Sequence, residues 1–591
     1  MVMKALPFIV ALLLFAPFVG SDFVASALGE YGQQISKWPG VGALAAAALG
    51  AAAVCFWFVR DGRSRPTGKL TGAGTAIAWF TFAAAVALQM LSWRLVGIAS
   101  VTRSASWSIS ADPVLYTLSQ VAAGKTLLVD LPSQYGLYPE ILGPLFKLAG
   151  LSVFKVSALF AALQVVSLCA IYYVLSCLIK TRTLLVIAGI ALVMMTFETD
   201  LHFSGLDERY YQYWPIRFFW PAVSVAAFFF FSRNRTLARG AVLSVLGATG
   251  LLWNLDSGLF IIVAYGAYLV SRLIAIMLMS RQGAAPAGPE PWSARTYLAA
   301  LLLHVLITLS IVAAFLGYLL WKADRPLHLV WLVEYPRIFY SLGLMMLPLP
   351  HRIDPWMSVL CVYLLGLFRS LSAWRRSAPT VRDDVLFYLS ILGLGLFVYY
   401  EGRSHVLNLV SVCWPAILVV AILADEVLRA VRARVLPMGY LWSPIASVAL
   451  LLLAGSSFAV GVPRLFTEAV RQYATRRVPE DPVVQSELAF IKAHAERRRE
   501  CLILSKRQGI YYAETGLASP VAGPGLIETL LKSDEERLVS TFLNGRISCV
   551  FLGVGTDADP GLGIPLPDVL ASYGIYGQNP EGTMLYLQPK S

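Results

Sequence analysis

Residues 93–151, which lie between two apolar segments, contain the side chains best suited to chemistry. Asp112 precedes Pro113, a pair typical of the first turn of a helix with the Asp at its N-cap. A carboxylate at the boundary of water and membrane can have a raised pKa and act as a general base near neutral pH. Asp130 is the second candidate base. Each acid also has a plainer interpretation: Asp112 as an N-cap, and Asp130 as the residue that holds a turn ahead of Pro132.

The pattern around Asp112 predicts two short helices in this stretch. Val114, Leu118 and Val121 form one apolar face, so we expect a helix lying on the membrane surface. Gly124 can end this helix, and a second one is predicted to start after Pro139.

Three other connections between apolar segments have polar side chains that could bind a phosphate or a sugar. Arg217 follows a proline where a segment begins, and its guanidinium could face a lipid phosphate. Asn254 and Asp256 interrupt an apolar stretch, and we expect both to point toward the same external site, although a tight external turn would also explain them. The third set is Arg403, His405 and Asn408. These residues could bind a phosphate, or they could merely solvate a turn and pair with Glu401.

The connection before Arg217 is rich in acids and aromatic residues. Glu198, Asp200 and His202 could bind a divalent metal such as Mg or Mn. Their spacing matches no specific metal motif, so we favour a hydrated rim that binds sugar. Tyr211 and its aromatic neighbours suit either stacking against a sugar ring or an aromatic belt at the membrane interface.

The composition places these connections in a membrane protein. Of the 591 residues, 58% are hydrophobic and 14% are charged, against about 25% charged in an ordinary soluble domain. This excludes a soluble multidomain enzyme and a disordered chain. The net charge of +12 is scattered in short clusters between apolar runs rather than gathered on one face, so we expect no nucleic acid partner.

The apolar runs predict a polytopic α-helical membrane protein with about thirteen transmembrane helices. Alternate connections are rich in Lys and Arg, which places the N-terminus and those connections in the cytoplasm and the residues after about 462 outside. No cleavage site closely follows the first run, so we expect it to stay as an anchor in a multi-pass protein of the cytoplasmic (inner) membrane. The predicted spans are 5–20, 41–59, 73–92, 152–178, 183–198, 217–232, 239–254, 257–279, 296–320, 355–370, 384–401, 406–424 and 439–461.

The tail, residues 463–591, reads as a small exported α/β domain. Helical patterns at 483–495, 525–531 and 534–543 alternate with strand-like runs at 501–504, 549–552 and 584–587. Cys501 and Cys549 each open a strand-like run, and a disulfide and two buried thiols are both compatible with the sequence. Gly-Pro-Gly at 523–525 lacks the spacing of a phosphate loop. We interpret the tail as a structural or acceptor-docking cap.

The stretch from Asp112 through Ala123-Gly124-Lys125 and Asp130 to Tyr138-Pro139 resembles the first external loop of the GT-C superfamily of membrane glycosyltransferases. The resemblance implies a polyprenyl-phosphate-linked sugar donor, inverting transfer outside the membrane to a glycan, lipid or protein acceptor, and Asp112 as general base. It implies membrane lipids as partners. In that framework, the candidate sugar or acceptor ligands are Gln134, Tyr135, Tyr211, Asn254 and Asp256.

This loop usually follows the first span in the family, whereas here it follows the third. Residues 1–72 are therefore interpreted as a two-helix addition and residues 73–462 as the catalytic membrane module. Two alternatives remain. An O-antigen type polymerase or ligase also uses external Arg and His, but would not need the loop with Asp112. A lipid-linked glycan transporter or flippase predicts ionisable residues within spans, of which His304 is the clearest.

Overall fold

The computed structural model describes most of the chain from residue 72 onward. The described ranges are 72–92, 111–204, 211–281, 292–341, 344, 347–349, 355–376, 380–433, 465–467, 469–470, 482–544, 547–555, 560, 562 and 565–590. The predicted spans 5–20, 41–59 and 439–461 lie outside the described residues.

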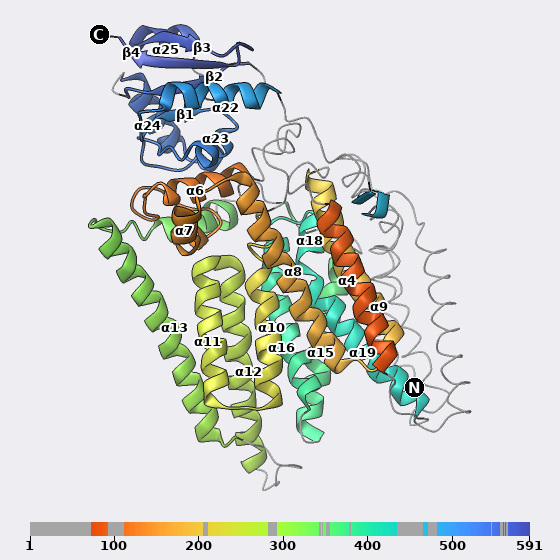
Figure 1. Ribbon diagram of the computed structural model, residues 1–591. Coiled ribbons are helices and arrows are strands. Elements are labelled where there is room, and N and C mark those ends of the chain that lie inside the picture. Colours follow the sequence, from red (N-terminus) through yellow and green to blue (C-terminus); the bar gives the residue numbers. More distant parts are fainter. Residues whose placement is uncertain are drawn as a thin grey trace.

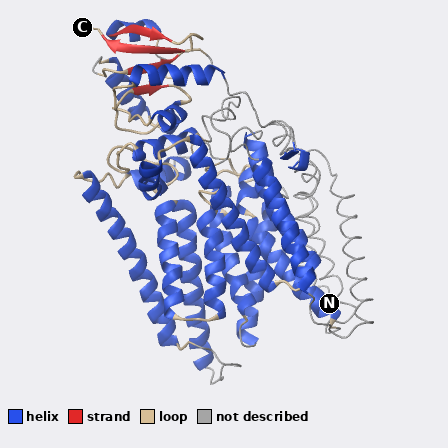
Figure 2. Ribbon diagram, viewed as in Figure 1, coloured by secondary structure: helices blue, strands red, loops and turns tan. Residues whose placement is uncertain are grey.

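A bundle of apolar helices makes up the larger part of the molecule (Figures 1 and 2). Every span predicted between residues 73 and 424 corresponds to a helix or to two short consecutive helices. The helices are α4 (Gly72–Ser92), α8 (Val153–Leu178), α9 (Arg182–Ser204), α10 (Phe219–Arg233), α11 (Leu237–Trp253), α12 (Leu255–Arg281), α13 (Ala294–Ala323), α15 (Pro355–Arg376), α16 (Val381–Leu396), α17 (Val398–Gly402), α18 (Val406–Val412) and α19 (Trp414–Arg432).

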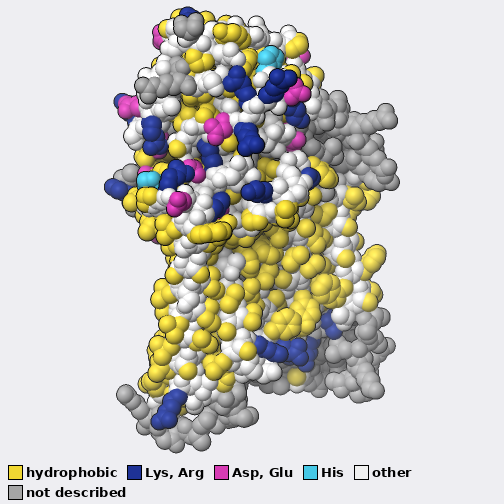
Figure 3. All heavy atoms as spheres, turned by 60° about the vertical axis from the view of Figure 1, so that its left-hand side comes forward, with side chains coloured by type: hydrophobic (Ala, Val, Ile, Leu, Met, Phe, Trp, Pro, Cys, Tyr) yellow, Lys and Arg dark blue, Asp and Glu magenta, His cyan; other side chains and the backbone are white. Residues whose placement is uncertain are grey.

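Five of the described helices are long and apolar enough to cross a membrane: those at Gly74–Leu91, Val153–Leu178, Leu255–Met279, Ala294–Ala323 and Val381–Gly402. Four shorter apolar helices accompany them. A broad hydrophobic surface covers the bundle, with charged side chains gathered above it and a few Lys and Arg side chains below (Figure 3). The protein is therefore mostly helical, and several of its helices are long enough to span a membrane.

The stretch with Asp112 folds as two short helices, as predicted, and lies between the bundle and the tail (Figure 1). They are α6 (Asp112–Ala122) and α7 (Tyr138–Ala149). Two details of the prediction are wrong. Ala111 occupies the N-cap, with no side-chain cap bond. Residues 112–121 of α6 are all buried, because the tail packs on the helix, so α6 is not exposed at the membrane surface.

The tail is a small α/β domain. Its helices are α22 (Pro482–Ala495), α23 (Gln508–Thr515), α24 (Lys532–Leu543) and α25 (Leu566–Ser572). Its sheet, in the order β1-β2-β4-β3, consists of β1 (Leu502–Leu504), β2 (Val550–Gly553), β4 (Met584–Pro589) and β3 (Tyr573–Gln578).

Strands β1 and β2 are parallel and the other two pairs are antiparallel. The predicted helix at 525–531 forms only a single 3-10 turn, η4 (Leu526–Glu528). Gly525 precedes this turn, and Pro524 restricts the chain just before it.

A disulfide joins Cys501 and Cys549, the residues that precede the paired strands β1 and β2. The Cα atoms lie 4.8 Å apart, which is within the normal range for such a bond. The structure therefore resolves the alternative that the sequence left open, in favour of the disulfide.

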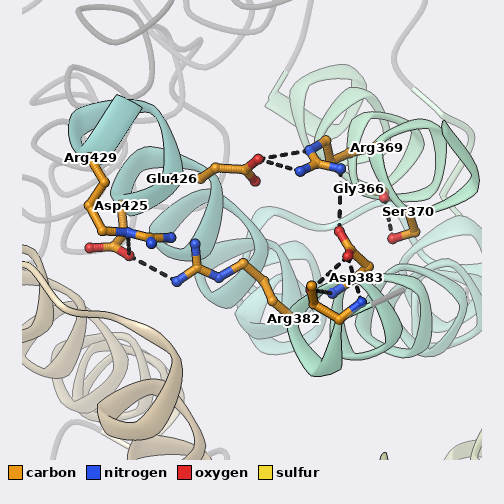
Figure 4. Close-up of polar contacts among 9 residues, drawn as sticks. Gly366, Arg369, Ser370, Arg382, Asp383, Asp425, Glu426 and Arg429 are labelled. Carbon is orange, nitrogen blue, oxygen red and sulfur yellow. Dashed lines mark hydrogen bonds and ion pairs between the residues drawn. The ribbon is translucent and has the colours of Figure 1, made fainter. Parts of the chain in front are cut away.

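The end of the bundle opposite the tail, called here the basic end, is held by ion pairs (Figure 4). Asp425 of α19 is fully buried and accepts from Arg382 at 3.0 Å and from Arg429 at 2.9 Å. Its other oxygen accepts the backbone N–H groups of residues 180 and 181. Asp383 caps α16 through a capping box with Thr380. These contacts tie α9, α16 and α19 together.

Candidate functional site

Asp112 lies at the contact between α6 and the tail. Its side chain has no exposed surface, and its Oδ1 accepts the backbone N–H of Gly509, at 2.6 Å, near the start of α23. The approach is close, because a Cβ on Gly509 would lie 2.8 Å from that oxygen. Asp112 Oδ2 has no hydrogen-bond partner among the described residues. One oxygen of this buried carboxyl is thus fixed by the tail, and the carboxyl also interacts with the nearby Gln508 amide.

Two tail residues that the sequence analysis did not select lie beside Asp112. The side chain of Gln508 is 4% exposed, and its Nε2 lacks a partner within the described residues. Glu528 is 1% exposed; its Oε1 accepts the backbone N–H of Gln134 at 3.0 Å, while Oε2 has no described partner. Asp112, Gln508 and Glu528 form what we call the carboxyl cluster.

Burial sets the protonation of this cluster. Loss of solvent raises the pKa of Asp112 to about 8, despite the opposing effects of the Gly509 N–H and the nearby Gln508 amide. Burial likewise raises the pKa of Glu528 to about 8, and the neighbouring charge of Asp112 acts in the same direction. A carboxyl with a pKa in this range can exchange a proton near neutral pH.

Arg217 forms a second centre on the bundle side of the loop. Its Nη2 lies 2.9 Å from Asp256 Oδ2 and its Nη1 donates to the Gln212 carbonyl at 2.6 Å. The guanidinium carbon lies 5.4 Å from the Tyr135 ring centroid and 4.8 Å from that of Tyr399. Arg217 is largely buried rather than open to a lipid phosphate. Its guanidinium contacts Asp256, Tyr135 and Tyr399, which come from three different parts of the chain.

Asn254 links this centre to the loop. It stands between α11 and α12, and its Oδ1 caps α12 by accepting the N–H of Ser257 at 3.0 Å. Its Nδ2 donates to the Tyr135 carbonyl at 3.0 Å. Gly136 lies so close to Trp253 that a Cβ would be 2.2 Å from its carbonyl oxygen. Asn254 thus contacts Tyr135 and Asp256 contacts Arg217, whose guanidinium lies by the Tyr135 ring; a shared external site for both remains a prediction.

Asp130 lies in a different environment from Asp112. Its Oδ2 accepts the backbone N–H of Thr126 at 2.8 Å, and its Oδ1 pairs with the exposed Arg325 at 2.6 Å. Its carbonyl accepts the N–H of Gly523 from the tail. Both carboxyl oxygens are engaged, so the geometry matches a residue that holds a turn.

Arg403, His405 and Asn408 lie in the turn between α17 and α18. Arg403 is exposed, and its carbonyl accepts from the His405 N–H at 2.7 Å and from Asn408 Nδ2 at 2.9 Å. Tyr399, one turn earlier, contacts Arg217. This set therefore lies at the same end of the bundle as Arg217, with the Arg403 guanidinium facing outward.

The acid-rich connection is only partly described. Glu198, Asp200 and His202 fall within the backbone of α9, but their side chains lie outside the described residues. Among the side chains that are described, no group of three or more His, Cys, Asp or Glu could hold a metal ion. Tyr211 is 4% exposed and its hydroxyl bonds Ser157, so it packs inside the protein.

Comparison with known proteins identifies no relative: no family model matches the chain, and no curated protein is significantly similar to it. The assignment of function therefore depends on the geometry of the site. The sequence pattern that could have drawn attention to Gln508 and Glu528 is Gly-Pro-Gly at 523–525. In the structure Gly525 packs against Gln508, since a Cβ on Gly525 would come 3.1 Å from Gln508 Nε2.

Proposed function

We propose that this protein is a membrane glycosyltransferase of the GT-C type. It transfers a sugar from a polyprenyl-phosphate donor to a hydroxyl of an acceptor, on the side of the membrane where the tail lies. The observation that carries the proposal is Asp112: a fully buried carboxyl with one oxygen fixed by Gly509 and the other unpartnered among the described residues.

The reaction needs one base and one stabilised leaving group. Asp112 Oδ2 accepts the proton of the acceptor hydroxyl as its oxygen attacks the anomeric carbon. The bond between that carbon and the phosphate oxygen breaks, and the electron pair leaves with the polyprenyl phosphate. A single displacement of this kind inverts the anomeric centre. The base form of Asp112 becomes more abundant as pH approaches its pKa of about 8.

The exposed Arg403 is the cation proposed to stabilise the departing phosphate, and the buried Arg217, paired with Asp256, positions the neighbouring Tyr135 and Tyr399. Arg217 is preorganised, because Asp256, the Gln212 carbonyl and two aromatic rings hold its guanidinium. His405 and Asn408 shape the turn that presents Arg403. Tyr135 lies beside Arg217 and interacts electrostatically with Glu528 of the carboxyl cluster; the donor is proposed to bind on the side of Arg403 and the acceptor on the side of the carboxyl cluster.

The proposal includes the full topology: about thirteen spans in the cytoplasmic membrane, with the tail outside. Two features support it. The Cys501–Cys549 disulfide suits an oxidising compartment. The basic end carries buried or half-buried Arg residues with acidic partners, as expected for cytoplasmic ends of spans rich in Lys and Arg.

The transporter alternative draws no support from His304. Its ring nitrogens contact Ser244 Oγ at 2.9 Å and the Ile262 carbonyl at 3.2 Å. A histidine held on both sides in this way packs α13 against α11 and α12 and offers no open partner for a proton relay.

The test uses purified full-length protein in lipid vesicles, with radiolabelled undecaprenyl-phosphate sugars and a set of glycan, lipid and peptide acceptors. We expect transfer by the wild type and a loss of about 10²- to 10⁴-fold in Asp112→Asn. Asp130→Asn is the matched control and should lose far less. Undiminished transfer by Asp112→Asn would remove the proposed base.

A further inference from the structure

Helix α23 of the tail lies between α22 and α6 (Figure 1). Its N-cap residue Arg507 and Tyr511, four residues apart, both contact α22. Gly509 and Tyr512, three residues apart, both contact α6. A contact that fixes α23 against α22 therefore also fixes its position over α6.

A buried ion pair joins α23 to α22. Glu487 of α22 has no exposed surface. Its Oε2 lies 3.4 Å from Arg507 Nη1 and accepts the Tyr511 hydroxyl. Its Oε1 has no partner among the described residues, so the carboxyl is not fully paired. A buried acid paired in this way adds little to stability, which leaves the placement of α23 as its main contribution.

The contact of α23 with α6 has no spare room. The Gly509 N–H donates to Asp112 Oδ1 at 2.6 Å, and the rings of Tyr512 and Tyr116 meet edge to face with centroids 5.6 Å apart. A Cβ on Gly509 would come 2.7 Å from the Asp112 carbonyl oxygen. Hydrogen bonds of this kind extend to about 3.2 Å, so a shift of α23 by about 1 Å would release Asp112 Oδ1.

The other end of α6 is held by a later part of the tail. Gln120 Oε1 accepts the N–H of Ser519 at 2.8 Å. Just after the helix, Lys125 Nζ donates to the Val521 carbonyl at 2.9 Å. Because α6 is fixed there, a shift of α23 changes the contact at Asp112 and does not carry α6 along with it.

We propose that Glu487 is a positioning residue of the site: through Arg507 and Tyr511 it places the first turn of α23 so that the Gly509 N–H holds Asp112 Oδ1. Its effect on transfer rests on the proposed function, whereas the contact between the helices does not. The tail is then part of the site, because it supplies the donor that keeps one oxygen of the proposed base in place.

The pH dependence of transfer tests this role in the full-length protein in lipid vesicles. Glu487→Gln keeps an acceptor for Tyr511 but loses the charge that pairs with Arg507. Because the Gly509 N–H lowers the pKa of Asp112, its displacement should raise that pKa further. Transfer should then fall by about tenfold at pH 7 and recover as the pH rises above about 9. A variant that merely unfolds would lose activity at every pH.

Two further variants accompany Glu487→Gln. Glu536→Gln is the matched control, because Glu536 and its partner Lys532 are 66% and 86% exposed; its transfer should equal that of the wild type at each pH. Tyr511→Phe keeps the ion pair and removes only the hydroxyl, so it disturbs the core less. Its loss at pH 7 should be smaller, about threefold, with the same recovery at high pH.

Hydrogen exchange follows the contact without turnover. In lipid nanodiscs, Glu487→Gln should exchange faster than the wild type in residues 508–516 of α23 and also in residues 112–122 of α6. Exchange in residues 294–323 of α13 should not change. Acceleration in both α23 and α6 is expected only if the ion pair acts across the contact between them.

The outcomes separate this inference from the proposed function. An equal loss of transfer at every pH, unchanged transfer at pH 7 in both Glu487→Gln and Tyr511→Phe, or faster exchange confined to the tail would each overturn the positioning role. Transfer that still depends on Asp112 would in that case retain the proposed function. A wild type that transfers no sugar would remove the proposed function, while faster exchange in both helices would still support the positioning contact.

Discussion

The two ends of the helical bundle differ in the partners that they provide to a buried carboxylate. At the basic end, Asp425 has two guanidinium partners and two backbone N–H donors. Beside the tail, Asp112 has one backbone donor and an oxygen with no partner among the described residues. Both side chains are fully buried, so burial alone does not distinguish them. The two acids differ in their cationic partners: Asp425 has two, and Asp112 has none among the described residues.

A buried acid that is fully paired contributes to the assembly of the helices, whereas one that is incompletely paired is held at a cost in stability. Asp384 shares the cation of the first pattern but not its full pairing: its Oδ2 accepts from Arg235 and Ser232, both at 2.6 Å, while its Oδ1 has no partner among the described residues. Glu528 repeats the second. Residues whose pKa values are shifted by burial without a compensating cation occur preferentially at functional sites. We therefore propose a structural role for the basic end and a chemical role for the carboxyl cluster.

The largest expected effect is at the basic end. Asp425→Ala leaves two guanidinium groups and two backbone donors without their acceptor, and should lower the free energy of unfolding by about 3–5 kcal/mol. Denaturant unfolding in mild detergent measures it. The neighbouring Glu426→Ala is the control: Glu426 and its partner Arg369 are 28% and 38% exposed, so the loss should be under about 1 kcal/mol. Equal losses would contradict the distinction between the two acids.

Because the disulfide lies in the tail, we expect reductant to destabilise the tail and not the bundle. Cys549→Ser removes a cross-link between residues 48 apart in the sequence, which should destabilise the tail by about 2–4 kcal/mol. Limited proteolysis should then cleave the tail faster while the bundle stays intact. Cys413→Ser, in a buried residue of the bundle with a free thiol, should leave proteolysis of the tail unchanged; faster cleavage in that variant too would argue against an independent response.

Asn254 connects the bundle to the loop, because its Oδ1 caps α12 and its Nδ2 donates to the Tyr135 carbonyl. Asn254→Ala should cost about 1–2 kcal/mol through loss of the cap. Asn254→Asp keeps an acceptor for the Ser257 N–H but loses the donor to the Tyr135 carbonyl. Asn254 is 1% exposed, so the new carboxyl is buried beside the Tyr135 carbonyl without a cation, and we expect Asn254→Asp to lose at least as much stability as Asn254→Ala. Both variants lose the bond to Tyr135, and we expect both to raise the KM for the donor. An unchanged KM in both variants would indicate a cap alone.

The carboxyl cluster should also make stability depend on pH, with a slope of at most about 1.4 kcal/mol per pH unit for each carboxyl. Both pKa values in the carboxyl cluster are raised by folding, to about 8. The stability from the protonated acids is therefore complete below about pH 4 and is lost as pH rises toward 8. Thermal unfolding between pH 5 and 8 should show this decline, and Asp112→Asn with Glu528→Gln should flatten it. An unchanged slope would mean that neither acid titrates as described.

The sequence predicted the elements of this fold better than their contacts. Apolar runs locate the bundle helices, because a run of this length has few other stable conformations. Alternation and turn residues likewise locate three of the four strands. The strand β3 was missed, since Tyr573–Gln578 contains two glycines and little alternation.

The residues of the candidate site were selected on different grounds. Asn254 and Asp256 interrupt an apolar stretch, and Arg217 stands where a span begins. Asp112 was selected from its place before Pro113 and from the resemblance of its loop. Glu528 and Gln508 were not found, since both lie in a polar tail where acids and amides are ordinary. Their importance comes from packing between segments about 400 positions apart, which no local pattern encodes.

The central claim is that Asp112 acts in chemistry and not in assembly. The direct measurement determines two quantities for Asp112→Asn in the same preparation: the rate of sugar transfer in vesicles and the free energy of unfolding. We predict a rate at least about a hundredfold below the wild type, with stability at pH 7 close to that of the wild type, because an acid with a pKa of about 8 is already mostly neutral there. A variant that transfers sugar at the wild-type rate, or that loses activity only because it unfolds, would contradict the account.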